Sequence, residues 1–231
     1  MTLADTRFSD RRRKLAAEVA GMRIDAVLVT HLVHVRYLSG FSGSNGGLLL
    51  RKDLSALMAT DGRYTTQIAE EVPDLEAVLG RPVGPALLRR LEGPLRVAFE
   101  ADYVSVSELK ALEEAAPEGV ELVPMSGVIE DIRLVKDPQE LERLEHIAAL
   151  ANEALEGLVA AGEVAVGRTE RQIAADLEYR MRKLGSERVS FDTIVASGPN
   201  SAKPHHGADD RVLVSGDLVT IDFGAHLRGF N

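Results

Sequence analysis

The sequence contains no cysteine among its 231 residues. This absence excludes disulfide scaffolds, thiolate metal sites and cysteine nucleophiles, and it fits a reducing compartment. Tryptophan is absent as well, and there are only four Tyr and six Phe. The core must therefore be built mostly from Leu, Val, Ile and Ala.

The chain also lacks an excess of basic residues, since 27 Lys and Arg face 36 Asp and Glu, for a net charge of -9. A general nucleic-acid binder usually carries a basic excess, so no nucleic-acid partner is expected. The basic run at residues 11–14 is interpreted as a solvated helix face. No stretch approaches the ~20 apolar residues of a membrane span, and residues 1–10 lack the apolar core of a signal peptide. We expect a soluble cytoplasmic protein without a membrane partner.

The first 130 residues alternate between strand and helix patterns. Strands are predicted at 25–30, 48–51, 56–60, 75–79, 96–100 and 121–125, and helices at 6–22, 64–72, 85–91 and 105–116. This alternation predicts an α/β layered domain with a parallel or mixed sheet. The length suits two domains, and the patterning changes within 127–136. We therefore divide the chain into residues 1–130 and 131–231.

The second part opens on a strong helix start. Asp137 is an N-cap acid, Pro138 occupies the first helical position and Glu140 the third, which together form a capping box. A second helix is predicted to begin at Thr169, with Gln172 as its capping partner. Two strand-like segments, 193–197 and 217–223, follow it.

The residues that could carry chemistry lie in 191–231. A turn at 198–201 follows a strand, the loop at 204–207 carries His205 and His206, and Asp222 ends an apolar strand. A strand end is a rigid place from which to aim a ligand, and a buried carboxylate would need a metal or strong donors. Capping of the following turn is an equally good explanation of Asp222. His206 is interpreted as a solvated neighbour without a role.

The motifs F-x-x-I-V-x-S-G, P-H and G-D-L-V-x-I-D-x-G-A resemble the catalytic half of the creatinase-type, or pita-bread, enzymes. Segments 35–41, 60–64 and 132–136 resemble the N-terminal part of the members that have one: prolidase, aminopeptidase P and creatinase. The resemblance implies a creatinase-type α/β domain, with a ribonuclease H-like mixed sheet and flanking helices. The first part of an α+β pita-bread catalytic domain would follow it.

The same resemblance implies a Xaa-Pro dipeptidase, or prolidase, that uses two divalent ions to hydrolyse the bond before proline in small peptides. Manganese is the expected metal, with cobalt or zinc as alternatives. Asp222 matches the first acidic metal ligand of the family. His205 matches a catalytic, substrate-binding histidine that does not ligate the metals. The remaining ligands, one Asp, one His and two Glu, are expected after Asn231, so the isolated chain is expected to be inactive and not to bind the metals.

Four alternatives stay open. A Xaa-Pro aminopeptidase would differ only in the peptides that it accepts. A non-catalytic pita-bread interaction protein would lack the metal ligands, and a creatine hydrolase would use the same fold without metal. A plain α/β binding domain with a helical appendage would not explain the motif spacing. The family commonly forms dimers, so a homodimer is expected, with Arg36, Tyr37 and the loop 43–47 as candidates for its edge.

Overall fold

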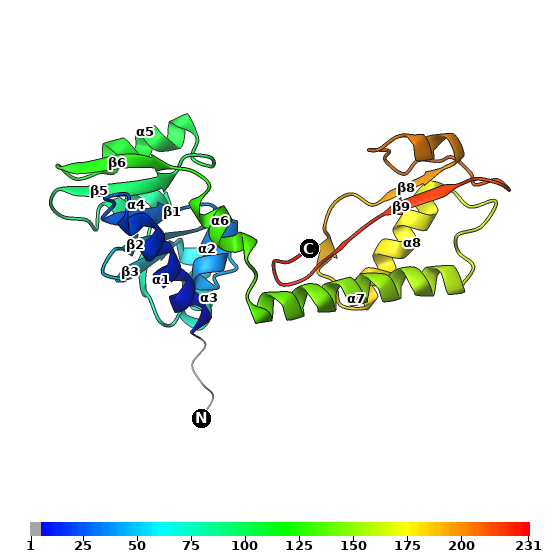
Figure 1. Cartoon of the computed structure of the whole chain (residues 1–231), viewed down its shortest axis with the longest axis horizontal. Helices are drawn as coiled ribbons and strands as arrows, with labels where there is room; N and C mark the ends of the chain where they lie inside the picture. Colours follow the sequence, from blue (N-terminus) through cyan, green and yellow to red (C-terminus); the bar gives the residue numbers. More distant parts are fainter. Residues whose placement is uncertain (1–5) are drawn as a thin grey trace, which may run out of the picture. The chain divides into compact units, whose positions relative to one another are not determined.

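The computed structural model describes residues 6–231, which divide into two compact units (Figure 1). Unit 1 ends at Val135, and unit 2 comprises Lys136–Asn231. The division predicted between residues 130 and 131 falls inside helix α6 (Val128–Leu134). The first five residues of the segment 1–10, discussed above for signal-peptide character, lie outside the described part of the chain.

Unit 1 is built on a mixed six-stranded sheet of order β4-β3-β2-β1-β5-β6, which confirms the predicted fold class. Its strands are β1 (Ala26–Val29), β2 (Gly46–Arg51), β3 (Ala56–Thr60), β4 (Glu76–Leu79), β5 (Leu95–Glu100) and β6 (Val120–Met125). The strands predicted at 48–51 and 56–60 correspond to β2 and β3, which pair antiparallel as a hairpin. The central strand β1 is antiparallel to β2 but parallel to β5.

Helices cover both faces of this sheet. As a result, all four residues of β1, which are apolar, are buried. Val27 and Val29 pack toward α1 (Arg7–Ala20), α2 (Leu32–Ser39), α3 (Thr65–Glu71) and α6. Ala26 and Leu28 face α4 (Val83–Leu88) and α5 (Val106–Ala115). A short 3-10 helix, η1 (Gly62–Tyr64), precedes α3. A strand that is buried on both sides reads as a continuous apolar run, as this one does.

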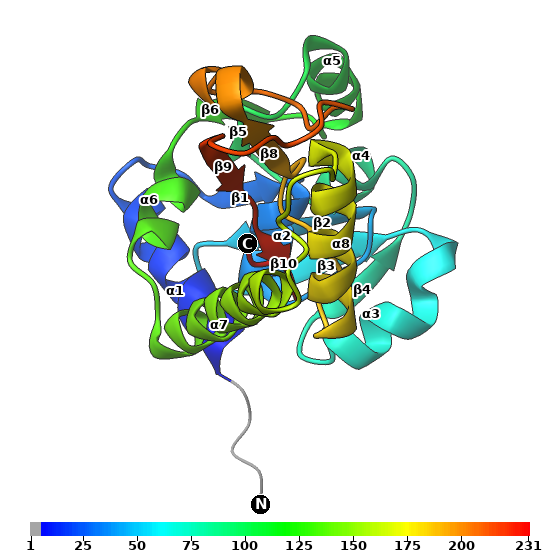
Figure 2. The ribbon, with the colours of Figure 1, turned by 90° about the vertical axis from the view of Figure 1, so that its right-hand side faces the viewer.

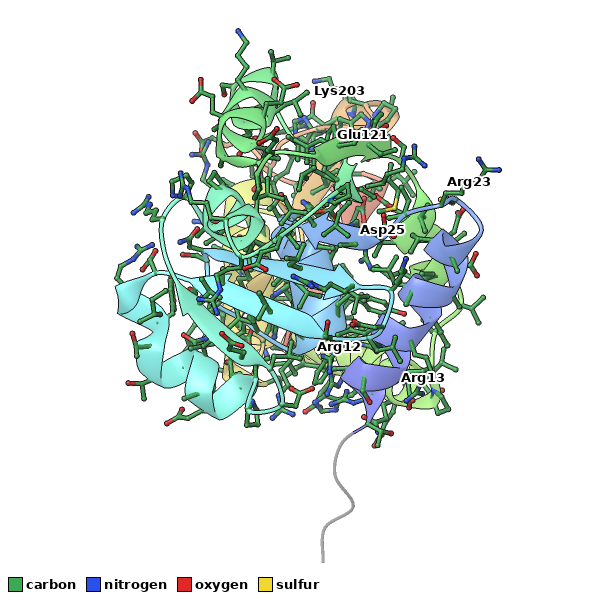
Figure 3. All side chains as sticks on the ribbon, turned by 90° about the vertical axis from the view of Figure 1, so that its left-hand side faces the viewer. Arg12, Arg13, Arg23, Asp25, Glu121 and Lys203 are labelled. Carbon is green, nitrogen blue, oxygen red and sulfur yellow. The ribbon has the colours of Figure 1, made fainter. Side chains whose placement is uncertain are left out.

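The basic run on α1 is not a solvated face throughout, so that prediction is wrong for Arg11 and Arg12. Both are buried, and they donate to the carbonyl oxygens of Tyr37 and Leu38 at 3.0 Å. The last carbonyl groups of a helix have no partner within the helix, and these arginines supply one for α2. Arg13, labelled beside Arg12 in Figure 3, has a side chain that is 62% exposed.

Unit 2 holds two helices and two small antiparallel sheets. Helix α7 (Pro138–Ala160) and helix α8 (Glu170–Lys183) begin with the two predicted capping boxes and pack together, as Figure 2 shows. One sheet pairs β8 (Ile194–Ser197) with β9 (Val219–Asp222), and the other pairs β7 (Arg188–Val189) with β10 (Ala225–His226). A 3-10 helix, η2 (Gly198–Ala202), follows β8. None of the helices in residues 6–231 is both long and apolar enough to cross a bilayer.

Candidate functional site

The motif residues of unit 2 lie around the β8–β9 ladder. Ile194 pairs with Asp222 at one end, and Ser197 pairs with Val219 at the other. At this second end η2 begins, and the Gly198 N–H donates to the Leu218 carbonyl at 2.9 Å. Three residue steps of about 3.3 Å separate the two ends, so Asp222 lies about 10 Å along the ladder from the start of η2.

The side chain of Asp222 is exposed and makes no hydrogen bond or ion pair with any of residues 6–231. The alternation of β9 explains this, because Val219 and Ile221 pack on the core of unit 2 while Thr220 and Asp222 face outward. Water therefore solvates the carboxylate, and no buried charge has to be offset here. Asp222 does not cap a turn through its side chain either.

The two adjacent histidines of the loop have opposite environments. His205 is exposed, whereas His206 is buried and its Nε2 lies 2.6 Å from Oε2 of Glu170. The interpretation of His206 as a solvated neighbour is therefore wrong. This contact holds the loop at the residue directly after His205, at the Ser197 end of the ladder. The described contacts do not bring His205 and Asp222 together.

Glu170 is the residue around which this region is organised. It is the first residue of α8, its exposure is 0%, and its carboxylate accepts hydrogen bonds from three separate segments. The donors are Ser197 N and Oγ at 2.7 Å each, Asn200 Nδ2 at 3.1 Å, His206 Nε2 at 2.6 Å and Asp209 N at 3.3 Å. We call Glu170, Ser197, Asn200, His206 and Asp209 the Glu170 cluster. It ties α8 to β8, to η2 and to the loop after His205.

The hydrogen bonds of the cluster keep Glu170 ionised. Burial alone would raise its pKa, but hydrogen bonds from Ser197, His206 and Asn200 outweigh burial and lower the pKa to about 2. Its position in the first turn of α8 also favours a negative charge, because the helix dipole is positive there. A carboxylate can only accept hydrogen bonds, so His206 donates its Nε2 proton.

An ion pair between Arg211 and Asp217 fixes the part of this loop that follows His206. Arg211 binds Asp217 through two hydrogen bonds of 2.7 and 3.0 Å and also donates to Ser197 Oγ. The Val214 N–H donates to Asp217 at 2.9 Å. The hydrogen bond from Arg211 is the main cause that lowers the pKa of Asp217. The loop that carries His205 is therefore held near Ser197 at two points. His206 is linked to Ser197 through Glu170, and Arg211 contacts Ser197 directly.

The potential ligand atoms of Glu170, His206 and Asp209 lie within 4.8 Å of one another, close enough to surround a cation. The hydrogen bonding of Glu170 argues against that role, because its two oxygens already serve five donor groups. A divalent ion that prefers six or more oxygen ligands would have to displace most of them. Asp222, which has no competing partner, has the donor chemistry that such an ion needs but supplies a single ligand. The described residues therefore do not make up a two-metal site.

Comparison with known proteins covers both units. Residues 11–135 match the creatinase/prolidase N-terminal domain, and residues 142–231 match metallopeptidase family M24. The chain belongs to the M24 metallopeptidase family. The prolidase-like resemblance of the sequence motifs is confirmed, and so is the order of a creatinase/prolidase N-terminal domain followed by part of an M24 domain.

Three M24 relatives illustrate the match. An uncharacterised peptidase of Bacillus subtilis is 36% identical over 213 residues, covering 90% of this chain and 58% of that protein. The structure of a Xaa-Pro dipeptidase from Bacillus anthracis is 32% identical with a TM-score of 0.88, covering 96% of this chain and 62% of that one. An X-Pro aminopeptidase from Thermotoga maritima is 33% identical with a TM-score of 0.79, covering 94% and 61%. The chain thus spans about three fifths of the length of these relatives.

Proposed function

We propose that the protein is a metal-dependent Xaa-Pro dipeptidase that hydrolyses the peptide bond preceding proline in small peptides. The observation that carries the proposal is the likeness to the Bacillus anthracis Xaa-Pro dipeptidase, which extends over 96% of the chain with a TM-score of 0.88. The likeness includes both units, so it is not a match to the N-terminal domain alone.

Asp222 is proposed as one ligand of a pair of divalent ions, with manganese as the first choice. Its carboxylate is exposed, lacks another partner and extends from a paired strand whose neighbouring residues are packed, which restricts its position. Such ions, when bound, lower the pKa of a coordinated water and polarise the carbonyl group of the substrate.

His205 is proposed to hold the substrate carbonyl or the tetrahedral intermediate by hydrogen bonding. The imidazole is exposed and can reach a ligand, while the backbone beside it is fixed by the bond from His206 to Glu170. A donor that is held in place before the substrate arrives loses little entropy on binding, which favours catalysis. We place Glu170 as a structural support of this loop and not as a reacting group.

The test uses the natural gene product in which this sequence occurs, loaded with Mn²⁺, and a matched set of peptides: Ala-Pro, Ala-Pro-Ala and Ala-Ala. A dipeptidase cleaves Ala-Pro and spares the other two. Cleavage of Ala-Pro-Ala would instead indicate an aminopeptidase, which the Thermotoga maritima structure supports as the second candidate. Failure to cleave any of the three would favour a non-catalytic interaction protein.

The isolated 231-residue chain is proposed to be inactive, because the carboxylate of Asp222 alone cannot hold two ions that each prefer about six ligands. Turnover of Ala-Pro by this chain above a metal-only blank would overturn that part of the proposal. Isothermal titration with Mn²⁺ gives a second readout, in which no binding stronger than that of an Asp222→Asn variant is expected.

We further propose that the protein forms a homodimer. Of the candidates for its edge, Tyr37 is buried, with the Arg11 guanidinium 4.2 Å from its ring centroid, so it serves packing within unit 1. Arg36 and the loop 43–47 remain as candidates. Sedimentation equilibrium of the natural gene product tests the proposal, and a monomer at all concentrations would contradict it.

A further inference from the structure

Unit 1 contains a cavity of about 460 Å³ that the peptidase proposal does not use. Thr30 and His31, which directly follow β1, line it together with Tyr103 and Val104, which follow β5. The rest of the wall comes mainly from residues in and next to α4 and α5 and from the start of β2. The volume falls within the roughly 300–1,000 Å³ that is typical of small-molecule sites.

The cavity lies where the connections of the sheet change direction. β1 and β5 are parallel neighbours, but β1 leads into α2 on one face while β5 leads into α5 on the other. Two helices that leave adjacent strands toward opposite faces open a crevice at the carboxyl ends of the strands. Ligands of open α/β sheets bind in this kind of crevice.

The beginning of α2 is not available for a ligand's negative charge. Glu100, at the end of β5, accepts hydrogen bonds from Thr30 N at 2.7 Å and His31 N at 2.9 Å, and it contacts Nδ1 of the buried His34 at 2.6 Å. The protein's own carboxylate thus fills the anion position that a helix N-terminus offers. A charged ligand must find its partner elsewhere in the cavity.

One wall of the cavity is aromatic and uncharged. The His31 ring stacks on Tyr103 with centroids 3.8 Å apart and planes 17° from parallel. Burial is the largest cause that lowers the pKa of His31, so the ring is neutral at pH 7. Leu32, Val83 and Leu112 add apolar surface. This wall suits the flat or aliphatic body of a small molecule.

Two charged side chains line the cavity, and only one of them is uncommitted. Glu108 accepts hydrogen bonds from Ser105 N at 2.8 Å and Ser105 Oγ at 2.7 Å, so its charge serves the capping box of α5. Arg81 is exposed and makes no ion pair or hydrogen bond with any residue in the described part of the chain. A guanidinium fork is the preferred partner of a carboxylate.

We propose that this cavity binds a small carboxylate with an aromatic or aliphatic body, whose carboxylate pairs with Arg81 and whose body lies against the His31–Tyr103 stack. All the residues that line the site belong to unit 1, whereas the M24 motifs belong to unit 2. Its test therefore succeeds or fails independently of any peptidase activity.

The test is an amide-detected NMR titration of the chain with phenylacetate and with its neutral isostere phenylacetamide. We expect both to shift the amide signals of Thr30, His31, Val104 and Ala111, with phenylacetate binding roughly tenfold more tightly because of its charge-assisted hydrogen bonds. Arg81→Gln should abolish this preference. The control Arg89→Gln, an exposed arginine at the end of α4 that does not line the cavity, should keep it.

A second variant, Ala111→Phe, places a large side chain in the cavity and should eliminate binding of both compounds while Arg89→Gln retains it. The proposal is overturned if neither compound shifts the lining residues, or if the shifts map elsewhere. Equal affinity of Arg81→Gln and Arg89→Gln for phenylacetate would overturn it as well. Should Ala111→Phe fail to fold, the comparison of the two arginine variants still decides the outcome.

Discussion

Replacing Glu170 by Gln tests whether the Glu170 cluster stabilises unit 2 through an ionised carboxylate. The pKa of Glu170 is about 2 in the folded chain, against an ordinary value of 4.5. A carboxyl group with a lowered pKa contributes stability that is fully present above the ordinary pKa. That stability is lost as the pH falls from about 4.5 toward 2. The difference corresponds to about 3 kcal/mol at neutral pH.

The Glu170→Gln substitution keeps the size of the side chain but removes the charge and turns one acceptor into a donor. The new amide group would face N–H and O–H donors from Ser197, Asn200 and His206, at least one of which would lose its partner. We expect the free energy of unfolding of unit 2 at pH 7 to fall by about 3 kcal/mol. The gap between native and variant chains should narrow steadily as the pH is lowered from 5 to 3.

The measurement is urea unfolding followed by far-UV circular dichroism at a series of pH values. Glu153→Gln, on the exposed surface of α7, is the matched control and should change the free energy of unfolding by less than about 0.5 kcal/mol at every pH. Two results would refute the reasoning. One is a Glu170→Gln variant as stable as the control, and the other is a stability loss that does not depend on pH.

Three further predictions concern the site. In the active gene product, Asp222→Asn should lower bound Mn²⁺, measured by plasma mass spectrometry, and turnover together, the latter by about 100-fold or more; normal values of both would remove Asp222 as a ligand. His205→Ala should lower kcat by about 100-fold at unchanged metal content, and loss of metal would mean that its role is misassigned. Gly198 has φ +49, and a Cβ there would lie 2.5 Å from Asp217 Oδ1. Gly198→Ala should therefore cost about 2 kcal/mol more in urea unfolding than Gly216→Ala, where φ is +93 and no atom is near. Equal losses of unfolding free energy in the two variants would show that the Asp217 side chain can move away from the added Cβ without cost, which would contradict the prediction.

The sequence predicts most of the helices and strands because their signals are local. Both long helices of unit 2 start at capping boxes, which depend on residues three positions apart. The alternation of strands and helices in unit 1 likewise indicates a layered α/β fold. The order in which the strands pair in the sheet cannot be predicted from such local signals. It depends on contacts between segments far apart in the chain, and the family resemblance implies only a mixed sheet with flanking helices.

Helix α2 shows where local signals fail. It has eight residues, two of them valine, which lowers intrinsic helix propensity. Its end is supported by Arg11 and Arg12, which lie 26 residues earlier in the chain. Basic residues beside acidic ones on a helix normally indicate a solvated face, so neither the helix nor the role of these arginines could be predicted from the sequence alone.

The sequence does not predict the structural role of Glu170 either, because that role also depends on distant residues. An acidic residue in the first turn of a helix is common, because it interacts favourably with the helix dipole. Nothing in its neighbourhood distinguishes a buried acceptor from an exposed one. Its hydrogen-bond donors follow it by 27 to 39 residues, so only the folded chain reveals that five donor groups converge on it.

Glu170 and Asp222 show how environment separates two carboxylates of one unit. A carboxylate that serves the scaffold must be saturated with donors, since an unpaired buried charge is costly. The same saturation makes it a poor metal ligand. A carboxylate that binds a metal needs oxygen lone pairs that internal donors leave available, and the side chain of Asp222 has no internal donor among residues 6–231. Burial alone would have favoured Glu170 as the functional acid, and a lowered pKa would have done the same. The availability of the oxygen atoms is the property that distinguishes the two, and it supports the proposal that Asp222 binds the metal while Glu170 supports the loop that carries His205.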